Sequence, residues 1–570
     1  MADIERQAVS PVDSISAVDP NYVVATVQDE KDAKELAIRT GYKQAMKRRW
    51  TRWGLLGIVQ AMASTWTAQS GALQLAIFEG GPSAMIYGFL LVTVANAIIA
   101  LSLSELVSCY PTSGGPYYWV GRLAGPKYGR YLSWCVGYFN TFSWIVVTAS
   151  VCSLTASQLM GCVLIYNPTY DVPRWTLYVV YMVMNIGPTF YAIFLNRTLP
   201  YISRFMFFFV CTGCLVSILM MVIAARGHYA STKFVWATWM NGELKFWLGN
   251  LVVFKVDEIL ETGWTNNAAC FFTGLINPAY SYGLLDGTIH LCEESEDPER
   301  NIPLAILSQV GIGFITGLFY IIAMMYSVSD IQAVLDSPIP NQEVYLQAMQ
   351  GGRPGAFILQ LIILICVTVA CLDLQLTQAR MTWSFARDGG LPFSGMLSKV
   401  NKRFKVPLYA QLFGDAIIII LGFLYLFAEE AYNALVGSAL VLSNLSLIIP
   451  IAAHLVTWRK VPTPGPFWLG KFGMVINFLT VCFLAFFIII FNLPYFMPVV
   501  GNIADMNWTC AVIGGIFVVS VVMWFIQGRK HYELSTGAPA TFDDVLEGQV
   551  VEHPVEHPVS ESEKGAEKKH

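Results

Sequence analysis

Residues 274–306, GLINPAYSYGLLDGTIHLCEESEDPERNIPLAI, decide the fold. They begin inside an apolar run of residues 268–290, and a helix of about that length, roughly 33 Å, crosses a bilayer. Asn277 and Pro278 interrupt this run. Because proline has no amide hydrogen, such an interruption is tolerated in lipid only where it faces protein or a water-filled cavity. The stretch predicts a broken membrane helix that lines a binding site. A proline kink without function is the alternative.

Two ionisable side chains follow this interruption. A charged residue inside a membrane helix costs at least about 2.5–3.5 kcal/mol, which makes Asp286 a functional candidate. His290 lies one helical turn further along the same face. We interpret Asp286 and His290 as a proton-linked gate below a bound solute. In the alternative, Asp286 bonds to neighbouring backbone and His290 lies in the wet interface.

The composition is that of a membrane protein with many spans. Of 570 residues, 55% are hydrophobic and 13% are charged, whereas soluble domains carry about 25% charged residues. The twelve cysteines show no metal-ligand or disulfide pattern. The sequence also contains no nucleotide-binding loop and no pairing of a nucleophile with a base. We therefore expect no enzyme activity, no cofactor, no metal and no nucleic-acid partner, and a lipid bilayer as the surroundings.

Apolar runs of spanning length predict an all-α polytopic membrane protein with twelve transmembrane helices. We expect the spans at residues 53–77, 84–107, 128–157, 174–194, 201–224, 267–289, 303–326, 355–379, 407–427, 432–457, 472–494 and 508–527. Lysines and arginines gather in the loops that follow even-numbered spans, which places these loops and both termini in the cytoplasm. Residues 1–40 and 528–570 are predicted to be disordered cytoplasmic tails around a transporter domain of residues 41–527.

Small polar side chains in the first span predict a second broken helix. Spans 1 and 6 each open a set of five, as corresponding spans do in inverted-repeat transporters. An unwound stretch near Ala61 to Thr65 would hold a solute carboxylate, because helix amino ends carry roughly +0.5 charge and free amides. The alternative is that these small residues only pack helices together.

Six ordered motifs resemble the fungal amino acid/choline transporter family of the amino acid–polyamine–organocation superfamily. They are GYKQAMKR, EGGPSAMIYG, SELVSCYPTSGGPYYW, INPAYSYGLLDGTIHLCEE with NIPLAI, ARMTWSFARDGGLP and GPFWLGKFG. The resemblance implies two inverted five-helix repeats, spans 1–5 and 6–10 with broken helices 1 and 6, plus two extra helices. It also implies secondary active transport. Among the GABA and choline permeases of this family, the choline permeases resemble the chain more, in the run INPA-aromatic-Ser-aromatic and in Trp66.

The chain departs from the family pattern in two places. Family members carry glycines through the first break, whereas this chain has IVQAMAST. Residues 242–260 form an extra stretch that is too short for a comfortable span. We interpret it as an extracellular or interfacial insertion or as an artefact of the gene model.

The predicted substrate-binding residues come from the two expected breaks. They are Ala61, Met62, Ala63, Ser64, Thr65 and Trp66 in span 1, and Asn277, Tyr280, Ser281 and Tyr282 in span 6. Trp66, Tyr280 and Tyr282 offer aromatic faces to an ammonium group, worth about 2 kcal/mol when desolvated, although most aromatic residues face lipid or core. We expect Glu105 and Asp373 to pair with a cytoplasmic arginine such as Arg380, as structural contacts or as a switching gate.

The sequence is best interpreted as a permease of the plasma membrane. We expect it to take up a small amine-bearing solute, choline-like or an amino acid such as GABA, together with a proton. An exporter or vacuolar transporter of an amino-acid-derived metabolite and a non-transporting nutrient sensor are the alternatives. The resemblance further implies a ubiquitin ligase as a partner, acting on tail lysines such as Lys564, Lys568 and Lys569.

Overall fold

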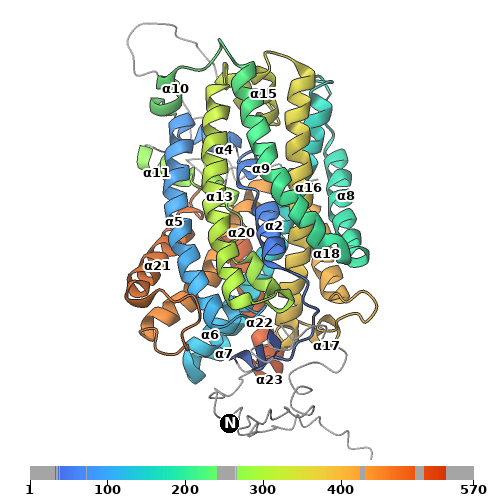
Figure 1. Ribbon diagram of the computed structural model, residues 1–570, viewed down its shortest axis with the longest axis vertical. Coiled ribbons are helices and arrows are strands. Elements are labelled where there is room, and N and C mark those ends of the chain that lie inside the picture. The colour runs from blue at the N-terminus through green and yellow to red at the C-terminus, as the bar shows by residue number, and fades with distance from the viewer. Residues whose placement is uncertain are drawn as a thin grey trace, which may run out of the picture.

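The computed structural model is a bundle of long helices that run side by side (Figure 1). It describes residues 32–33, 36–37, 39–71, 73–170, 172–240, 264, 266–423, 431–494 and 506–534. The extra stretch 242–260 and most of both predicted tails lie outside these residues. An isolated bridge joins Trp50 to Ser295, and the named elements of the described part are helices.

Nine helices of the described part are long and apolar enough to cross a membrane. They contain α5 (Gly81–Cys109), α7 (Gly125–Leu164), α8 (Arg174–Phe194), α9 (Leu199–Ala224), α13 (Pro298–Tyr326), α16 (Arg353–Arg387), α20 (Ala431–Val456), α21 (Gly473–Ile490) and α22 (Thr509–Met523). The shorter α18 (Leu408–Gly422) and two interrupted segments occupy the three remaining predicted positions. The prediction of an all-α polytopic membrane protein is confirmed.

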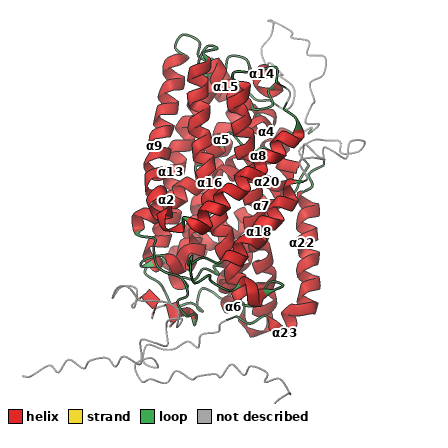
Figure 2. Cartoon of the chain, turned by 90° about the vertical axis from the view of Figure 1, so that its right-hand side faces the viewer, coloured by secondary structure: helices red, strands yellow, loops and turns green. Residues whose placement is uncertain are grey.

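Short helices connect the spanning ones. They are α6 (Pro116–Leu123), η1 (Asn196–Thr198), α10 (Thr232–Ala237), α14 (Ile331–Asp336), α15 (Pro340–Ala348), α17 (Ser394–Leu397), η3 (Gly470–Phe472), η5 (Trp524–Gly528) and α23 (Arg529–His531). Among them, α6 is buried in the core with Tyr117, Tyr118 and Trp119. Helix α22 stands at one edge of the bundle (Figure 2) and is mostly exposed, as a lipid-facing helix would be.

The long helices pack in the pairs expected if the chain consists of two related halves. Helix α5 packs along α13, and α7 packs along α16. In the predicted numbering, spans 2 and 3 of the first half therefore contact spans 7 and 8 of the second. Each half also begins with an interrupted segment, so the interruptions fall where an inverted repeat requires them.

The interruption of span 1 lies at Ser64. Helix α2 (Arg52–Ala63) ends there, and the four-residue α3 (Thr65–Ala68) follows, with α4 (Leu73–Phe78) after it. Ser64 adopts φ 34° and ψ 56°, a left-handed conformation that side chains with a Cβ disfavour. The break therefore forms without the glycine that the family pattern would place in this stretch.

The interruption of span 6 does not lie at Pro278, as the sequence suggested. Pro278 belongs to α12 (Ile276–Ser281), where it occupies the first turn, and an amide hydrogen there has no intrahelical partner anyway. The chain turns before this helix, after α11 (Asn267–Thr273), and again at residues 282–286, before the 3-10 helix η2 (Gly287–Glu294). Gly283 has φ +63° in the second turn.

The described ends of the chain meet at one end of the bundle. Tyr42 donates a 2.6 Å hydrogen bond to Asp388, and the amide of Glu533 donates to the Asp388 carbonyl at 3.1 Å. Tyr532 is fully buried against Trp134. Tyr532, which belongs to the predicted C-terminal tail, therefore packs against the bundle.

Candidate functional site

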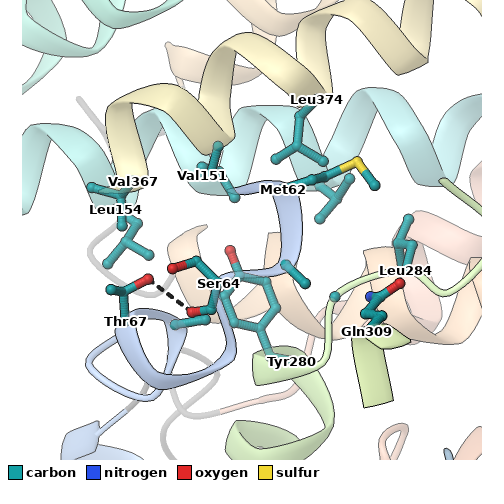
Figure 3. A pocket seen from close by; sticks show the side chains of 15 residues that line it. Met62, Ser64, Thr67, Val151, Leu154, Tyr280, Leu284, Gln309, Val367 and Leu374 are labelled. Carbon is teal, nitrogen blue, oxygen red and sulfur yellow. Dashed lines mark hydrogen bonds between the residues drawn. The ribbon is translucent and has the colours of Figure 1, made fainter. Parts of the chain in front are cut away.

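A cavity lies between the two interrupted spans, with about 490 Å³ of empty volume when its open side is included (Figure 3). Helices α7 and α16 close its other sides. The lining residues are Met62, Ala63, Ser64, Thr67, Ala68, Val147, Val151, Leu154, Tyr280, Gly283, Leu284, Gln309, Val367, Ala370 and Leu374. Most of the wall is apolar, and none of the lining side chains is charged. The wall suits a small solute with an apolar body.

A few polar groups interrupt the apolar wall. The buried hydroxyl of Ser64 has no hydrogen-bond partner, whereas its carbonyl accepts from Thr67 Oγ1 at 2.8 Å (Figure 3). The Tyr280 hydroxyl lies 3.0 Å from Ser150 Oγ on α7. Polar groups placed singly in an apolar cavity are the usual means of orienting a small ligand.

Gln309 of α13 holds the second break in place. Its Nε2 atom donates a 2.5 Å hydrogen bond to the carbonyl of Tyr282, the first residue after α12. Its Oε1 atom is buried without a partner, although Gln309 lines the cavity. The side chain thus replaces a helical hydrogen bond that the break removes, and it offers an acceptor for a solute.

Trp66 and Tyr282 do not form the predicted aromatic wall. Trp66 is fully buried, donates to the Val210 carbonyl at 3.2 Å and packs edge-on against Tyr320. Tyr282 stacks on Phe89 and lies 2.5 Å from Thr93 Oγ1. Neither lines the cavity. Both side chains follow their breaks but turn toward neighbouring helices, so Tyr280 supplies the aromatic face of this wall.

Other predicted binding residues join the two interrupted spans to each other. Asn277 Nδ2 donates to the Gln69 carbonyl at 3.3 Å, and Gln69 Nε2 donates to Ser281 Oγ at 2.9 Å. Thr65 packs against Gly313, where an added Cβ would lie 2.5 Å from Thr65 Oγ1. Ala61 is buried and does not line the cavity. Met62, Ala63, Ser64 and Tyr280 are the predicted residues that line it.

Asp286 and His290 form a buried pair. His290 Nε2 lies 3.3 Å from Asp286 Oδ2, and both side chains are fully buried. The same carboxylate oxygen accepts from Asn140 at 2.6 Å and from Trp144 at 3.3 Å. His290 is therefore not at a wet interface, because it is enclosed by protein.

The histidine partners indicate how many protons this pair holds. His290 Nδ1 lies 2.8 Å from the Ser113 carbonyl, which only accepts, so Nδ1 carries a hydrogen. A second proton must then lie between Nε2 and Asp286, on one or the other. Without it, a lone pair on Nε2 would face a carboxylate. The 3.3 Å distance between Nε2 and Asp286 Oδ2 allows the two groups to share a hydrogen.

Of the predicted gate residues, Glu105 pairs with an arginine as expected, whereas Asp373 does not. Arg380 bonds Glu294 of η2, with Nε 2.7 Å from Oε1. Glu105 is bound by Arg459 and accepts from Asn477 at 3.2 Å. The expected pairing of Asp373 with an arginine is wrong, because Arg380 is turned toward η2 and both Asp373 carboxylate oxygens are buried without a hydrogen bond.

The end of the bundle where the described termini meet is closed by a polar cluster around Asp388. The Tyr42 and Tyr117 hydroxyls donate to Asp388 Oδ2 at 2.6 and 2.9 Å. Arg387 bonds Glu293 at 3.0 Å and lies over the Tyr42 ring. Burial raises the pKa of Asp388 to about 6, although Arg387 and the two hydroxyls oppose the rise. The cluster ties the N-terminal segment to α6, α16 and η2.

A second cavity, of about 400 Å³, lies on the other side of the span 6 break. It is lined by Asn96, Ile99, Ala279, Gly283, Leu284, Leu285, Leu440, Ser443, Asn444, Leu447, Phe487 and Phe491. Gly283 and Leu284 line both cavities. These two residues are therefore common to the two walls.

Several lining residues were missed from the sequence. Gln309 carried a signal, because it is a lone amide in the apolar run 303–326. The aliphatic lining residues of α7 and α16 carried none. They occur in long apolar helices, and which face of such a helix meets a cavity depends on the packing of the whole bundle.

Comparisons with known proteins agree with this architecture. Residues 56–518 match the family described as amino acid permease. The chain is 33% identical to the choline transporter of Saccharomyces cerevisiae over 88% of its own length and 85% of that protein. It is 27% identical to amino-acid permease BAT1 of Arabidopsis thaliana, over 90% and 97% of the two chains. It is 24% identical to the GABA-specific permease of Saccharomyces cerevisiae, over 94% and 88%. The chain is a multi-pass membrane protein that belongs to the amino acid permease family.

Proposed function

We propose that the chain is a secondary transporter of a small amine-bearing solute, choline-like or an amino acid, which binds in the cavity between the two interrupted spans. The observation that carries this proposal is the cavity itself, which is enclosed by both breaks and by α7 and α16. Non-helical backbone at membrane depth is tolerated where it lines a cavity, and substrate sites of inverted-repeat transporters lie at such breaks. The permease and transporter names of the relatives support the same activity and do not suggest an enzyme.

The lining favours a solute whose charge is screened by alkyl groups. An ammonium group gains from the face of Tyr280, whereas the carboxylate of a zwitterion needs donors. Ser64 is the hydroxyl of the lining that has no partner. We therefore propose a choline-like compound first and GABA or another amino acid second, consistent with the 33% identity to a choline transporter.

Proton-coupled uptake across the plasma membrane completes the proposal. The Asp286–His290 pair supports it, because its hydrogen-bond geometry calls for a proton that can be given up. The end of the bundle with the Asp388 cluster is then cytoplasmic. Tail lysines remain candidate sites for a ubiquitin ligase, and they lie outside the described residues.

Uptake by cells that lack their own choline and amino acid permeases tests the function. The cells would express the chain and be offered labelled choline, GABA, betaine and basic amino acids one at a time. We expect saturable choline uptake that unlabelled choline inhibits and betaine inhibits less. Uptake of GABA without inhibition by choline would select the amino acid alternative. Surface-expressed protein that moves none of these solutes in either direction would contradict the proposal.

A further inference from the structure

Asp373 is a buried carboxyl that the site described above does not use. It lies in the middle of α16 and is 0% exposed. Both of its carboxylate oxygens are buried without a hydrogen-bond partner. Its neighbours along the helix, Ala370 one turn earlier and Leu374 directly after it, line the cavity. Asp373 is therefore next to the proposed solute site but is not part of its wall.

The charged groups around α16 are engaged elsewhere. Among the described residues, no side chain forms a hydrogen bond with the Asp373 carboxyl. The elements packed against α16 contain these titratable groups: Arg52 of α2; Lys127, Tyr128, Arg130, Tyr131, Cys135, Tyr138, Cys152 and Cys162 of α7; Arg174, Tyr178, Tyr181 and Tyr191 of α8; Tyr201, Arg204, Cys211 and Cys214 of α9; Glu343 and Tyr345 of α15; Tyr409 and Asp415 of α18; and His290, Cys292, Glu293 and Glu294 of η2. Of the cations on α16 itself, Arg380 bonds Glu294 and Arg387 bonds Glu293.

A carboxylate without partners in this place is unfavourable, so the group has to bind something positive. Burying an isolated charge costs far more than burying a neutral acid. A metal ion would need several ligands, and in the described part of the chain no three His, Cys, Asp or Glu side chains are placed to share one. A proton needs only the carboxylate. The chemistry of the position therefore selects a proton.

Asp373 is connected to the first break by side-chain contacts. Thr377, one turn further along α16, donates to the Asp373 carbonyl at 2.9 Å. The same hydroxyl lies 3.7 Å from the sulfur of Met62, which lines the cavity. Met62 also packs against Gly287 of η2, where an added Cβ would lie 2.2 Å from Met62 Cε. The turn of α16 that contains Asp373 and Thr377 therefore contacts Met62, which touches both interrupted spans.

We propose that Asp373 is a proton-binding site of the transporter, separate from the Asp286–His290 pair. The carboxylate takes one proton from the side of the membrane to which the site is open, which forms one O–H bond and changes its charge from −1 to 0. It releases the proton to the other side when water reaches it there. This inference rests on the proposed function, since it makes Asp373 a second group whose protonation accompanies transport.

Infrared spectroscopy of the purified full-length protein tests the site without a solute. A protonated carboxyl gives a carbonyl band distinct from that of a carboxylate. We expect the wild-type spectrum at pH 7 to contain such a band that is missing in Asp373→Asn and shifted in Asp373→Glu. Asp415→Asn is the matched control, because Asp415 is another carboxyl inside a helix of the bundle but is bonded by Thr189 at 2.8 Å. The band that Asp373→Asn removes should persist in Asp415→Asn. If neither Asp373 variant alters the carboxylic acid bands, the inference is wrong.

Transport in vesicles tests the role. The purified protein is placed in vesicles at zero membrane potential, and a pH gradient drives uptake of labelled choline, or of GABA if the wild type prefers it. We expect Asp373→Asn to lower pH-driven accumulation at least tenfold while exchange stays measurable, and Asp373→Glu to recover part of the accumulation. Full pH-driven accumulation in Asp373→Asn would overturn the role. A wild type that moves no solute would instead contradict the proposed function, and the infrared result would still decide whether Asp373 binds a proton.

Discussion

Arg380 and Glu294 form a buried ion pair, with Arg380 Nε 2.7 Å from Glu294 Oε1 and side chains that are 1% and 4% exposed. The pair joins α16 to η2, the last part of the interrupted span 6. Both residues lie near the end of the bundle that the Asp388 cluster closes. A contact between these two elements fixes η2, and with it Asp286 and His290, against the long helix that lines the cavity.

Removing one partner of this pair should destabilise the protein more than removing both. Arg380→Met leaves the Glu294 carboxylate buried without its cation, which costs about 3–5 kcal/mol. The double variant Arg380→Met/Glu294→Met replaces the pair by apolar groups and should recover most of the loss. Thermal unfolding in detergent measures both. Equal melting temperatures for the single and the double variant would show that the pair is not a unit.

Asp388 should make the stability of the protein depend on pH. Burial raises the pKa of Asp388 to about 6, whereas an aspartate in the unfolded chain has a pKa of about 3.9. The folded protein therefore binds this proton more tightly. The free energy of unfolding should rise by up to about 3 kcal/mol as the pH is lowered from above 6 toward 4, and this gain is lost as the pH rises through 6.

Variants isolate the contribution of Asp388 from that of other groups. The melting temperature of the wild type should rise relative to that of Asp388→Asn as the pH is lowered from about 6 to about 4, and the difference should be constant outside this range. Tyr42→Phe removes a hydrogen bond that favours the carboxylate, so the upper limit of the pH window should move upward while the lower limit stays near the unfolded pKa. A constant difference between Asp388→Asn and wild type across this range would refute the prediction.

Tyr280 should contribute to the affinity for a quaternary amine. Tyr280→Leu removes the aromatic face of the cavity and should weaken choline uptake roughly tenfold, as expected for the loss of about 1.4–2 kcal/mol. Tyr280→Phe keeps the ring and should cost much less. The Michaelis constants of uptake measure both effects. Equal losses in the two variants would assign the role to the hydroxyl and its contact with Ser150 instead.

Trp66 offers a matched control for the aromatic face. Because Trp66 packs on Tyr320 and donates to the Val210 carbonyl, Trp66→Leu should lower the melting temperature and the amount of folded protein. The Michaelis constant of the remaining protein should change little. A tenfold weaker affinity without loss of stability would instead indicate that Trp66 belongs to the binding site, as the sequence predicted.

Asp286 should be required for coupling rather than for binding. Asp286→Asn removes the carboxylate that shares a proton with His290, so a pH gradient should no longer drive accumulation. Exchange of internal for external solute should remain measurable, because the cavity is lined by other residues. Vesicles with an imposed pH gradient measure both. Accumulation that keeps the wild-type pH dependence would exclude this role.

The sequence predicted which segments are interrupted better than where the interruptions lie. Apolar runs with a proline or with small polar residues mark the breaks in spans 1 and 6. The position of the second break was missed because Pro278 fits the first turn of a helix as well as it breaks one. The residue at the first break was also unexpected, because the left-handed conformation there is adopted by Ser64 and not by a glycine.

Partners of side chains were the least predictable part of the site. Tyr280 and Tyr282 are two residues apart, yet Tyr280 lines the cavity and Tyr282 stacks on Phe89. Asp373 and Arg380 share a face of α16, yet Arg380 bonds η2 instead. The partner of each side chain depends on which helices pack together, and the spacing of residues along one helix does not reveal how the helices pack.

The wall that Gly283 and Leu284 share has a consequence for the size of the solute. These residues stand between two cavities, and Gly283 has φ +63° in a stretch without regular helical structure. Displacing so short a stretch costs less than moving a helix, because few backbone hydrogen bonds are lost. The side chain at position 284 would then act as a size filter, and enlarging Leu284 should narrow the range of compounds accepted before it affects those already small enough to fit.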